Sequence, residues 1–300
     1  MMVTLTVFLG SGIIFAEPPL SATDSTGATV TLPRIPQRVV SLAPSLSELV
    51  FDLEAGSSLV GRTSRCNFPE EARNVTDIGG YMTPDFEKLL TVKPELVLAT
   101  KNGMRSELIQ RIKTLGIAVY VDDSSSIDEI EKLIKNVGIL LGKTNRAEQL
   151  CMDIESRREK IRALISRSNI PTVLFVVGIN PLIVASSSSF VSSLISEAGG
   201  INVVNDLKIQ FPKFSVEEVI RKDPDVIFML DKECHGVECQ SYWKNYGFLK
   251  AVSNKRVYEV DSDLVSRPGT RIIDALERLT GHLHPEAASF IHSALPKPHL

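Results

Sequence analysis

The side chains that could take part in catalysis or bind a metal are few in this chain. Its 300 residues include five histidines, and none of them precedes residue 235. A Ser-His-Asp triad needs an imidazole beside its nucleophile, and zinc sites commonly use one as a ligand. The catalytic motifs G-x-S-x-G, G-x-x-x-x-G-K and H-E-x-x-H are also absent from the sequence. These observations argue against a hydrolase and against a zinc-capturing protein.

Two of the four cysteines, Cys234 and Cys239, flank the short segment CHGVEC. In an oxidising compartment such a pair forms a disulfide by default. The alternative is a soft metal site with His235 as a third ligand, but structural zinc takes four ligands and no further Cys or His lies nearby. Cys66 and Cys151 are expected to be unpaired, and Cys151 lies among apolar helix positions.

The N-terminus indicates the compartment. Residues 1–16 contain no charged side chain, and residues 3–15 are almost wholly apolar. A membrane span needs roughly 20 such residues, so this run predicts a secretory signal peptide that is cleaved near Ala16. It lacks a basic start, and a buried N-terminal strand is the alternative. Because the first cysteine afterwards is Cys66, we expect no lipid anchor and a mature protein that is free in the periplasm.

Charge and length limit the classes of function and fold. The formal net charge is −3, with 23% charged and 43% hydrophobic residues, which is typical of a soluble globular protein. A nucleic-acid partner would need a concentrated basic face, so none is expected. A chain of this length has room for two domains, each with its own core.

Two segments that lie 130 residues apart repeat one pattern, EKLLTVKPELVL at residues 87–98 and EEVIRKDPDVIF at residues 217–228. Each begins with a glutamate, continues as an amphipathic helix that stops at a proline, and ends in a short apolar run typical of a buried parallel strand. This duplication predicts two similar α/β lobes with a cleft between them, and the cleft is where a ligand is expected.

Strand and helix patterns alternate through both halves, which predicts parallel sheets with crossover helices. The expected strands comprise residues 38–44, 95–99, 117–121, 172–178, 225–230 and 256–260. Residues 144–167 carry one apolar stripe without Gly or Pro, which predicts a helix of roughly 35 Å that crosses both lobes. The fold class is thus α/β, with two Rossmann-like lobes joined by one long rigid helix. The predicted boundaries are a signal peptide at 1–16, an N-terminal lobe at 17–142, a connecting helix at 143–168 and a C-terminal lobe at 169–300.

Local signals also predict where individual helices begin. Three Ser-x-x-Glu capping boxes are expected to start helices, namely Ser45 with Glu48, Ser126 with Glu129, and Ser215 with Glu218. The serine run at residues 186–189 is expected to be a polar loop and a helix start. Trp243 is interpreted as a core residue, with a position in the cleft as the alternative.

Several longer segments carry a resemblance to a known family. They are RVVSLAPSLSEL, VGRTSRCNFPEEA, the two repeats, FVVGINPLIVA, SEAGGINVV and RVYEVDSDLVSRPGTRIIDAL, and they cover nearly all of the mature chain. Together they resemble the periplasmic solute-binding proteins of cobalamin and iron-chelate ABC importers. The resemblance implies the class III periplasmic binding protein fold, no catalysis, no cofactor and a monomer. It implies cobalamin or a related corrinoid as the ligand, with an iron-siderophore or haem as the alternative.

The resemblance also implies partners. Glu87 and Glu217 match two glutamates that, in relatives, project from the tips of the lobes and meet arginines of the permease. Each lies in the first turns of a predicted helix, where the helix dipole favours a carboxylate. The alternative is that they only offset the dipole. The expected partners are therefore an ABC permease and its ATPase.

Loops at the carboxyl ends of the strands should line the cleft. The expected ligand-binding residues are Pro44, Arg65, Tyr81, Thr100, Asn180, Asp263 and Arg267. Tyr81 matches an aromatic residue that packs on the corrin in cobalamin-binding relatives, and Asp263 and Arg267 match polar positions that face ligand. Arg65 and Thr100 stand where a cobalamin binder has aromatic residues, and an arginine suits a carboxylate or an anionic chelate. The alternative for Arg267 is an ion pair with Asp263 in its own loop.

Two other classes of protein fit the same fold. An α/β enzyme would need titratable residues with perturbed pKa values and a base within reach of a nucleophile. The distribution of histidines argues against it. A sensor domain that docks to a receptor is not excluded by the sequence. The helix that connects the lobes predicts only modest closure when a ligand binds, because bending the helix would break backbone hydrogen bonds.

Overall fold

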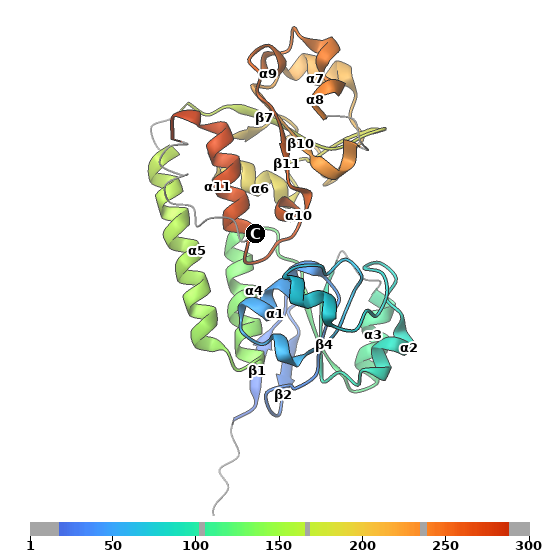
Figure 1. Cartoon of the computed structure of the whole chain (residues 1–300). Coiled ribbons are helices and arrows are strands. Elements are labelled where there is room, and N and C mark those ends of the chain that lie inside the picture. The colour runs from blue at the N-terminus through green and yellow to red at the C-terminus, as the bar shows by residue number, and fades with distance from the viewer. Residues whose placement is uncertain (1–17, 102–105, 166–168, 235–238, 288–300) are drawn as a thin grey trace, which may run out of the picture.

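The computed structural model describes residues 18–101, 106–165, 169–234 and 239–287. Two lobes lie one above the other in Figure 1, each built on a largely parallel sheet, and the long helix α5 (Thr144–Ile165) runs along one side of both. The predicted α/β fold with two lobes and one connecting helix is therefore confirmed. Among the described residues, no helix combines the length and the apolar character that crossing a membrane would take.

The N-terminal lobe is a four-stranded, fully parallel sheet. Its strands follow the order β4-β3-β5-β6, and they are β3 (Val39–Ser41), β4 (Leu59–Arg62), β5 (Leu96–Thr100) and β6 (Ala118–Asp122). The helices of this lobe are α1 (Pro44–Asp52), α2 (Phe86–Thr91), α3 (Ser106–Thr114) and α4 (Ile127–Leu140). A hairpin of β1 (Leu20–Thr23) and β2 (Thr29–Leu32) precedes the sheet, and Gly27 turns it with a φ of +83°.

The C-terminal lobe has a five-stranded sheet in the order β11-β10-β7-β8, with β9 also paired to β7. The strands are β7 (Thr172–Ile179), β8 (Leu182–Val184), β9 (Ile201–Asn202), β10 (Val226–Leu230) and β11 (Val257–Val260). Only β8 runs antiparallel to its neighbour. The helices are α6 (Phe190–Glu197), α7 (Val216–Lys222), α8 (Cys239–Tyr242), α9 (Lys250–Ser253), α10 (Ser262–Val265) and α11 (Ile272–Leu283).

The two repeated segments adopt the same conformation. Each contains a short helix (α2 or α7), a residue with positive φ directly before the proline, and then a buried strand (β5 or β10). The positive φ is +44° at Lys93 and +42° at Asp223. A left-handed residue ends an α-helix sharply and turns the chain toward its next element. The sequence repeat is therefore a repeat of structure.

The helix α5 connects the lobes through charged as well as apolar contacts. The side chain of Arg158 on this helix is 7% exposed. Its guanidinium pairs with Asp128 of α4 in one lobe and with Glu197 of α6 in the other, each at 2.5 Å. Arg157 pairs with Asp274 and Glu277 of α11 at 2.5 and 2.6 Å. These carboxylates raise the pKa of both guanidinium groups above the ordinary value. A buried cation with good partners on both lobes fixes the lobes to the helix.

One predicted helix start is wrong. The helix α1 begins at Pro44, with Ala43 as its N-cap and no side chain that caps it. Proline is favoured at the first helical position because its missing N–H would have no partner there. Ser45 therefore lies inside the helix, and Glu48 does not close a capping box. The other two predicted N-caps are confirmed. The side chain of Ser126 accepts a hydrogen bond from the backbone N–H of Glu129, and that of Ser215 accepts one from the backbone N–H of Glu218.

The remaining local predictions can be placed as well. Trp243 is fully buried and its Nε1 donates to the Sδ of Met229, so it is a core residue. Ser189 caps α6, as expected for the end of the serine run. Cys66 and Cys151 are free and buried. The predicted signal peptide and the side chains of the predicted Cys234–Cys239 disulfide lie outside the described residues, so both stay predictions.

Candidate functional site

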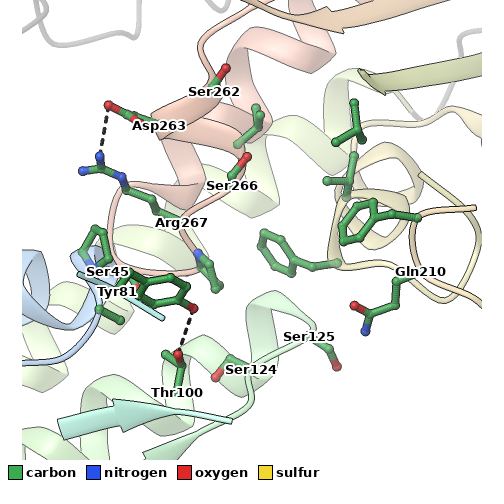
Figure 2. A pocket seen from close by; sticks show the side chains of 18 of the residues that line it. Ser45, Tyr81, Thr100, Ser124, Ser125, Gln210, Ser262, Asp263, Ser266 and Arg267 are labelled. Carbon is green, nitrogen blue, oxygen red and sulfur yellow. Dashed lines mark hydrogen bonds and ion pairs between the residues drawn. The ribbon is translucent and has the colours of Figure 1, made fainter. Parts of the chain in front are cut away.

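A cleft of about 530 Å³ lies between the lobes and has walls from both of them. Figure 2 shows it from close by. From the N-terminal lobe it is lined by Ala43, Pro44, Ser45, Arg65, Tyr81, Thr100, Asp122, Asp123, Ser124 and Ser125. From the C-terminal lobe it is lined by Phe175, Val177, Phe190, Val191, Gln210, Phe211, Leu230, Ser262, Asp263, Val265, Ser266, Arg267 and Pro268. A volume of this order fits a small-molecule ligand.

The structure brings most of the predicted ligand-binding residues to this cleft. Those that line it are Pro44, Arg65, Tyr81, Thr100, Asp263 and Arg267. Asn180 does not line it, because it lies exposed in the short turn between β7 and β8. A loop that follows the carboxyl end of a parallel strand lies at the cleft. Asn180 instead lies in the turn of the β7–β8 hairpin, which leads the chain away from the cleft. Contact of the other residues with a ligand remains a prediction.

Tyr81 and Thr100 form a fixed pair on the N-terminal wall. Their hydroxyl oxygens lie 3.0 Å apart, within hydrogen-bond distance (Figure 2). Thr100 is the last residue of β5, and Tyr81 comes from the loop before α2. A partly buried tyrosine whose hydroxyl is held in this way offers its ring as a rigid apolar surface. This wall can therefore pack against a flat ligand.

Arg267 does not offer a free charge to the cleft. Its guanidinium, 10% exposed, donates to Oε1 of Glu48 at 2.7 Å and to Oδ1 of Asn67 at 2.9 Å. It also lies 3.0 Å from the carboxylate of Asp263, so the expected ion pair within its own loop is present. Asp263 pairs in addition with Lys232 at 2.6 Å, and these cations help to lower the pKa of its carboxyl. A charge with this many partners holds the wall together.

Arg65 is different. It lines the cleft, is exposed, and pairs with no carboxylate among the residues that the structure describes. Guanidinium groups bind carboxylates and phosphates through two parallel hydrogen bonds. Of the two arginines in the cleft, Arg65 is therefore the one that is available to an anionic group of a ligand.

Glu48 is a site residue that the sequence reasoning missed. Its carboxylate is 2% exposed and binds Arg271 as well as Arg267, with Nε of Arg271 at 2.9 Å. The guanidinium of Arg271 also lies over the ring of Phe68, 4.0 Å from its centroid. No local signal in the sequence marks this carboxylate, because its own face of the helix also carries Ser45 and Asp52.

A second missed residue is Asp122, at the carboxyl end of β6. It is almost wholly buried at the edge of the cleft, and it accepts hydrogen bonds from the backbone N–H of Ser124 at 3.1 Å and its Oγ at 2.6 Å. Burial raises its pKa to about 6, because a charged carboxylate loses its hydration there. Asp123 beside it pairs with Lys101 at 2.7 Å. The signal was its place directly after a predicted strand.

The apolar part of the cleft comes from the C-terminal lobe and was also missed. It consists of Phe175, Val177, Phe190, Val191, Phe211, Leu230 and Val265. Several of these belong to strands whose sequence is typical of a core, and nothing local separates a strand end in the core from one that faces a cleft. The C-terminal lobe thus supplies most of the aliphatic and aromatic side chains of the cleft, and both lobes contribute polar groups. Such a cleft suits an amphipathic ligand that has a flat apolar face and polar edges.

The described residues contain no group of three or more His, Cys, Asp or Glu side chains placed to hold a metal ion. The lining residues include no histidine and no cysteine. The cleft therefore presents a binding surface of aromatic, aliphatic and hydrogen-bonding groups.

Comparison with known proteins places the chain. The sequence profile described as periplasmic binding protein matches residues 39–264. An uncharacterized ABC transporter substrate-binding lipoprotein of Bacillus subtilis (strain 168) is 30% identical over 278 residues, which cover 89% of this chain and 86% of that protein.

Solved structures agree with this match. The periplasmic vitamin B12 binding protein BtuF of Vibrio cholerae has a TM-score of 0.76 at 25% identity, and the similarity covers 84% of this chain and 98% of that one. The periplasmic heme-binding protein RhuT from Roseiflexus sp. RS-1 has a TM-score of 0.75 at 29% identity, covering 83% and 98%. By sequence and by fold, the chain belongs to the periplasmic binding protein family, of the type that serves ABC importers.

Proposed function

We propose that this protein captures cobalamin or a related corrinoid in the cleft between its lobes and delivers it to the permease of an ABC importer. The observation that supports this most is the cleft itself, which is lined by Tyr81 on one lobe and by a group of apolar side chains on the other. A flat macrocycle with polar substituents matches both walls. The vitamin B12-binding protein of Vibrio cholerae, 25% identical over 248 residues, supports the same choice of ligand.

One observation favours a second candidate, haem or a ferric siderophore. Arg65 brings to the cleft a guanidinium that pairs with no carboxylate in the described part of the chain, and such a group gains most from an acidic ligand. Haem carries two carboxylates on one edge, whereas the periphery of cobalamin consists mainly of neutral amides. The similarity to the heme-binding protein RhuT is consistent with this candidate.

Calorimetric titration with cyanocobalamin, haemin and a ferric siderophore tests the proposal. The cognate ligand is expected to bind far more tightly than millimolar. If none of the three binds with a free energy better than about −4 kcal/mol, the proposed transport role of this cleft is wrong.

The variant Arg65→Gln separates the two candidates. It removes the charge and keeps a hydrogen-bonding side chain, so it should weaken an anionic ligand by tenfold or more and leave cyanocobalamin nearly unaffected. The matched control is Arg73→Gln, because Arg73 is an exposed arginine of the same lobe that is not part of the cleft lining.

Delivery requires a docking surface, and we propose Glu87 and Glu217 as part of it. Both side chains are exposed at the start of a helix, α2 or α7, and neither pairs with a cation among the described residues. Figure 1 shows these two helices on different lobes. Two carboxylates placed in this way can meet cations of a partner that lies across the mouth of the cleft, and charge pairs of this kind orient an encounter.

A further inference from the structure

The segment of residues 205–211 exposes large apolar side chains beside the cleft. Leu207 is 37% exposed, Ile209 is 68% exposed and Phe211 is 45% exposed. Single exposed apolar residues are normal on a protein surface, but three within five positions, next to a binding cleft, form a patch. We call this patch, residues 207–211, the apolar lip.

The lip is continuous with the cleft. Gln210 and Phe211 are both lining residues, and Figure 2 shows Gln210 on the side of the cleft opposite Arg267. On the other lobe, Met82 is 60% exposed and follows Tyr81, which also lines the cleft. On both lobes, exposed apolar residues are thus sequence neighbours of lining residues.

The backbone of the lip is held in place by the serine run. The Oγ of Ser186, which is fully buried, donates to the carbonyl of Ile209 at 2.7 Å, and its backbone N–H donates to the carbonyl of Gln210 at 2.9 Å. Ser187 donates from its Oγ to the carbonyl of Asn205 at 3.2 Å. These bonds fix the lip without covering its side chains. A segment that is anchored in this way presents apolar surface at a low entropic cost.

We infer that the apolar lip is a specificity-determining part of the ligand site, which contacts the part of the ligand that projects from the cleft. This inference depends on the proposed function and adds a chemical requirement to it, namely that the projecting part of the ligand presents some apolar surface to the lip. The occupant is the ligand because the lip and the lining share Gln210 and Phe211. Covering two exposed aliphatic side chains with an apolar group strengthens binding in proportion to the area removed from water.

The test is the double variant Leu207→Ser and Ile209→Ser, titrated with cyanocobalamin, haemin and a ferric siderophore beside the wild-type protein. Neither residue is part of the cleft lining, and both are exposed, so the fold should be unaffected. The probe that binds the wild-type protein best is expected to bind the variant at least tenfold more weakly. Phe248→Ser is the matched control, because Phe248 is 65% exposed and is not part of the cleft lining. The affinity of this control variant for the same probe should equal that of the wild-type protein.

The outcomes separate the lip from the function of the cleft. Equal affinity of the double variant and the wild-type protein would overturn the lip as a ligand contact and leave the proposed function intact. Equal affinity with reduced uptake into cells would also overturn it, in favour of a contact with the permease. If no probe binds even the wild-type protein, both inferences fall together.

Discussion

The carboxylate of Glu48 and the guanidinium of Arg267 meet across the two lobes at 2.7 Å, although 219 residues separate them along the chain. Arg271 binds the same carboxylate, and Thr270 between these arginines donates a hydrogen bond to Asp52, one turn after Glu48 on α1. Together with the pairs of Arg158 on α5 with Asp128 and Glu197, these bonds connect the two lobes. These bonds between the lobes give a second physical reason, besides the stiffness of the connecting helix, to expect only modest closure of the lobes on ligand binding.

Replacing Glu48 by Gln should destabilise the protein strongly. The amide cannot balance the charges of Arg267 and Arg271, and both guanidinium groups would stay largely out of water. Losing one partner of a buried ion pair costs about 3 kcal/mol or more. Urea unfolding measures the loss. Glu218→Gln is the control, because Glu218 forms an exposed pair with Arg221 at 2.5 Å, and it should leave the midpoint almost unchanged. Equal midpoints for both variants would contradict the role of Glu48.

The buried carboxyl of Asp122 predicts a dependence of stability on pH. Its folded-state pKa of about 6 lies above the ordinary value of 3.8. Between these two values the folded protein keeps a proton that the unfolded chain releases, so the free energy of unfolding falls as pH rises through this window.

The variant Asp122→Asn has no such proton and can keep the hydrogen bonds from Ser124. The free energy of unfolding of the variant minus that of the wild-type protein should therefore be larger at pH 7 than at pH 4, by on the order of 2 kcal/mol. Unfolding experiments at the two pH values measure the difference. A gain that is the same at both values would show that titration of Asp122 is not its source.

Counting the reactive thiols of the protein tests the predicted disulfide between Cys234 and Cys239. Cys66 and Cys151 are buried, and burial raises the pKa of the Cys151 thiol to about 11, so neither should react quickly with a thiol reagent in the folded protein at pH 8. Protein made in an oxidising compartment should show two reactive thiols after denaturation without reductant and four after reduction. Four thiols before reduction would mean that Cys234 and Cys239 are not joined.

Reversing the charge of both proposed docking residues, Glu87→Lys with Glu217→Lys, should abolish uptake and leave ligand affinity unchanged. The new lysines would repel the cations that we expect on the permease, while the cleft stays intact. Uptake of the ligand by cells and calorimetry on the purified protein measure the two effects separately. Glu107→Lys is the matched control, because Glu107 is also an exposed glutamate in the first turn of a helix. Normal uptake by the double variant would disprove the docking role.

The sequence predicts the elements of this fold well because their signals are local. The helix α5 begins at Thr144, as its apolar stripe indicates, and both repeats become a helix, a left-handed residue and a strand. Parallel strands that are buried on both faces are continuous apolar runs, so β5 and β10 were predicted to within one residue at each end.

The candidate site is predicted less completely because its contacts are not local. The pattern from Ser45 to Glu48 has the spacing of a capping box, but Pro44 starts the helix earlier and turns Glu48 toward partners in the other lobe. Phe175 has the sequence signature of a core strand and nevertheless lines the cleft. Only the packing of one lobe against the other decides which apolar residues remain open to a ligand.

The stretch from Ser262 to Arg271 contains both arginines that bind Glu48 and six of the residues that line the cleft. Side chains that line the cleft and side chains that join the lobes therefore lie within the same ten positions. A graft of this stretch from a relative with another ligand would bring in side chains that no longer match Glu48 and Asn67. Successful redesign of specificity should then require that these two residues be exchanged together with the loop, and natural relatives should have changed all of them in concert.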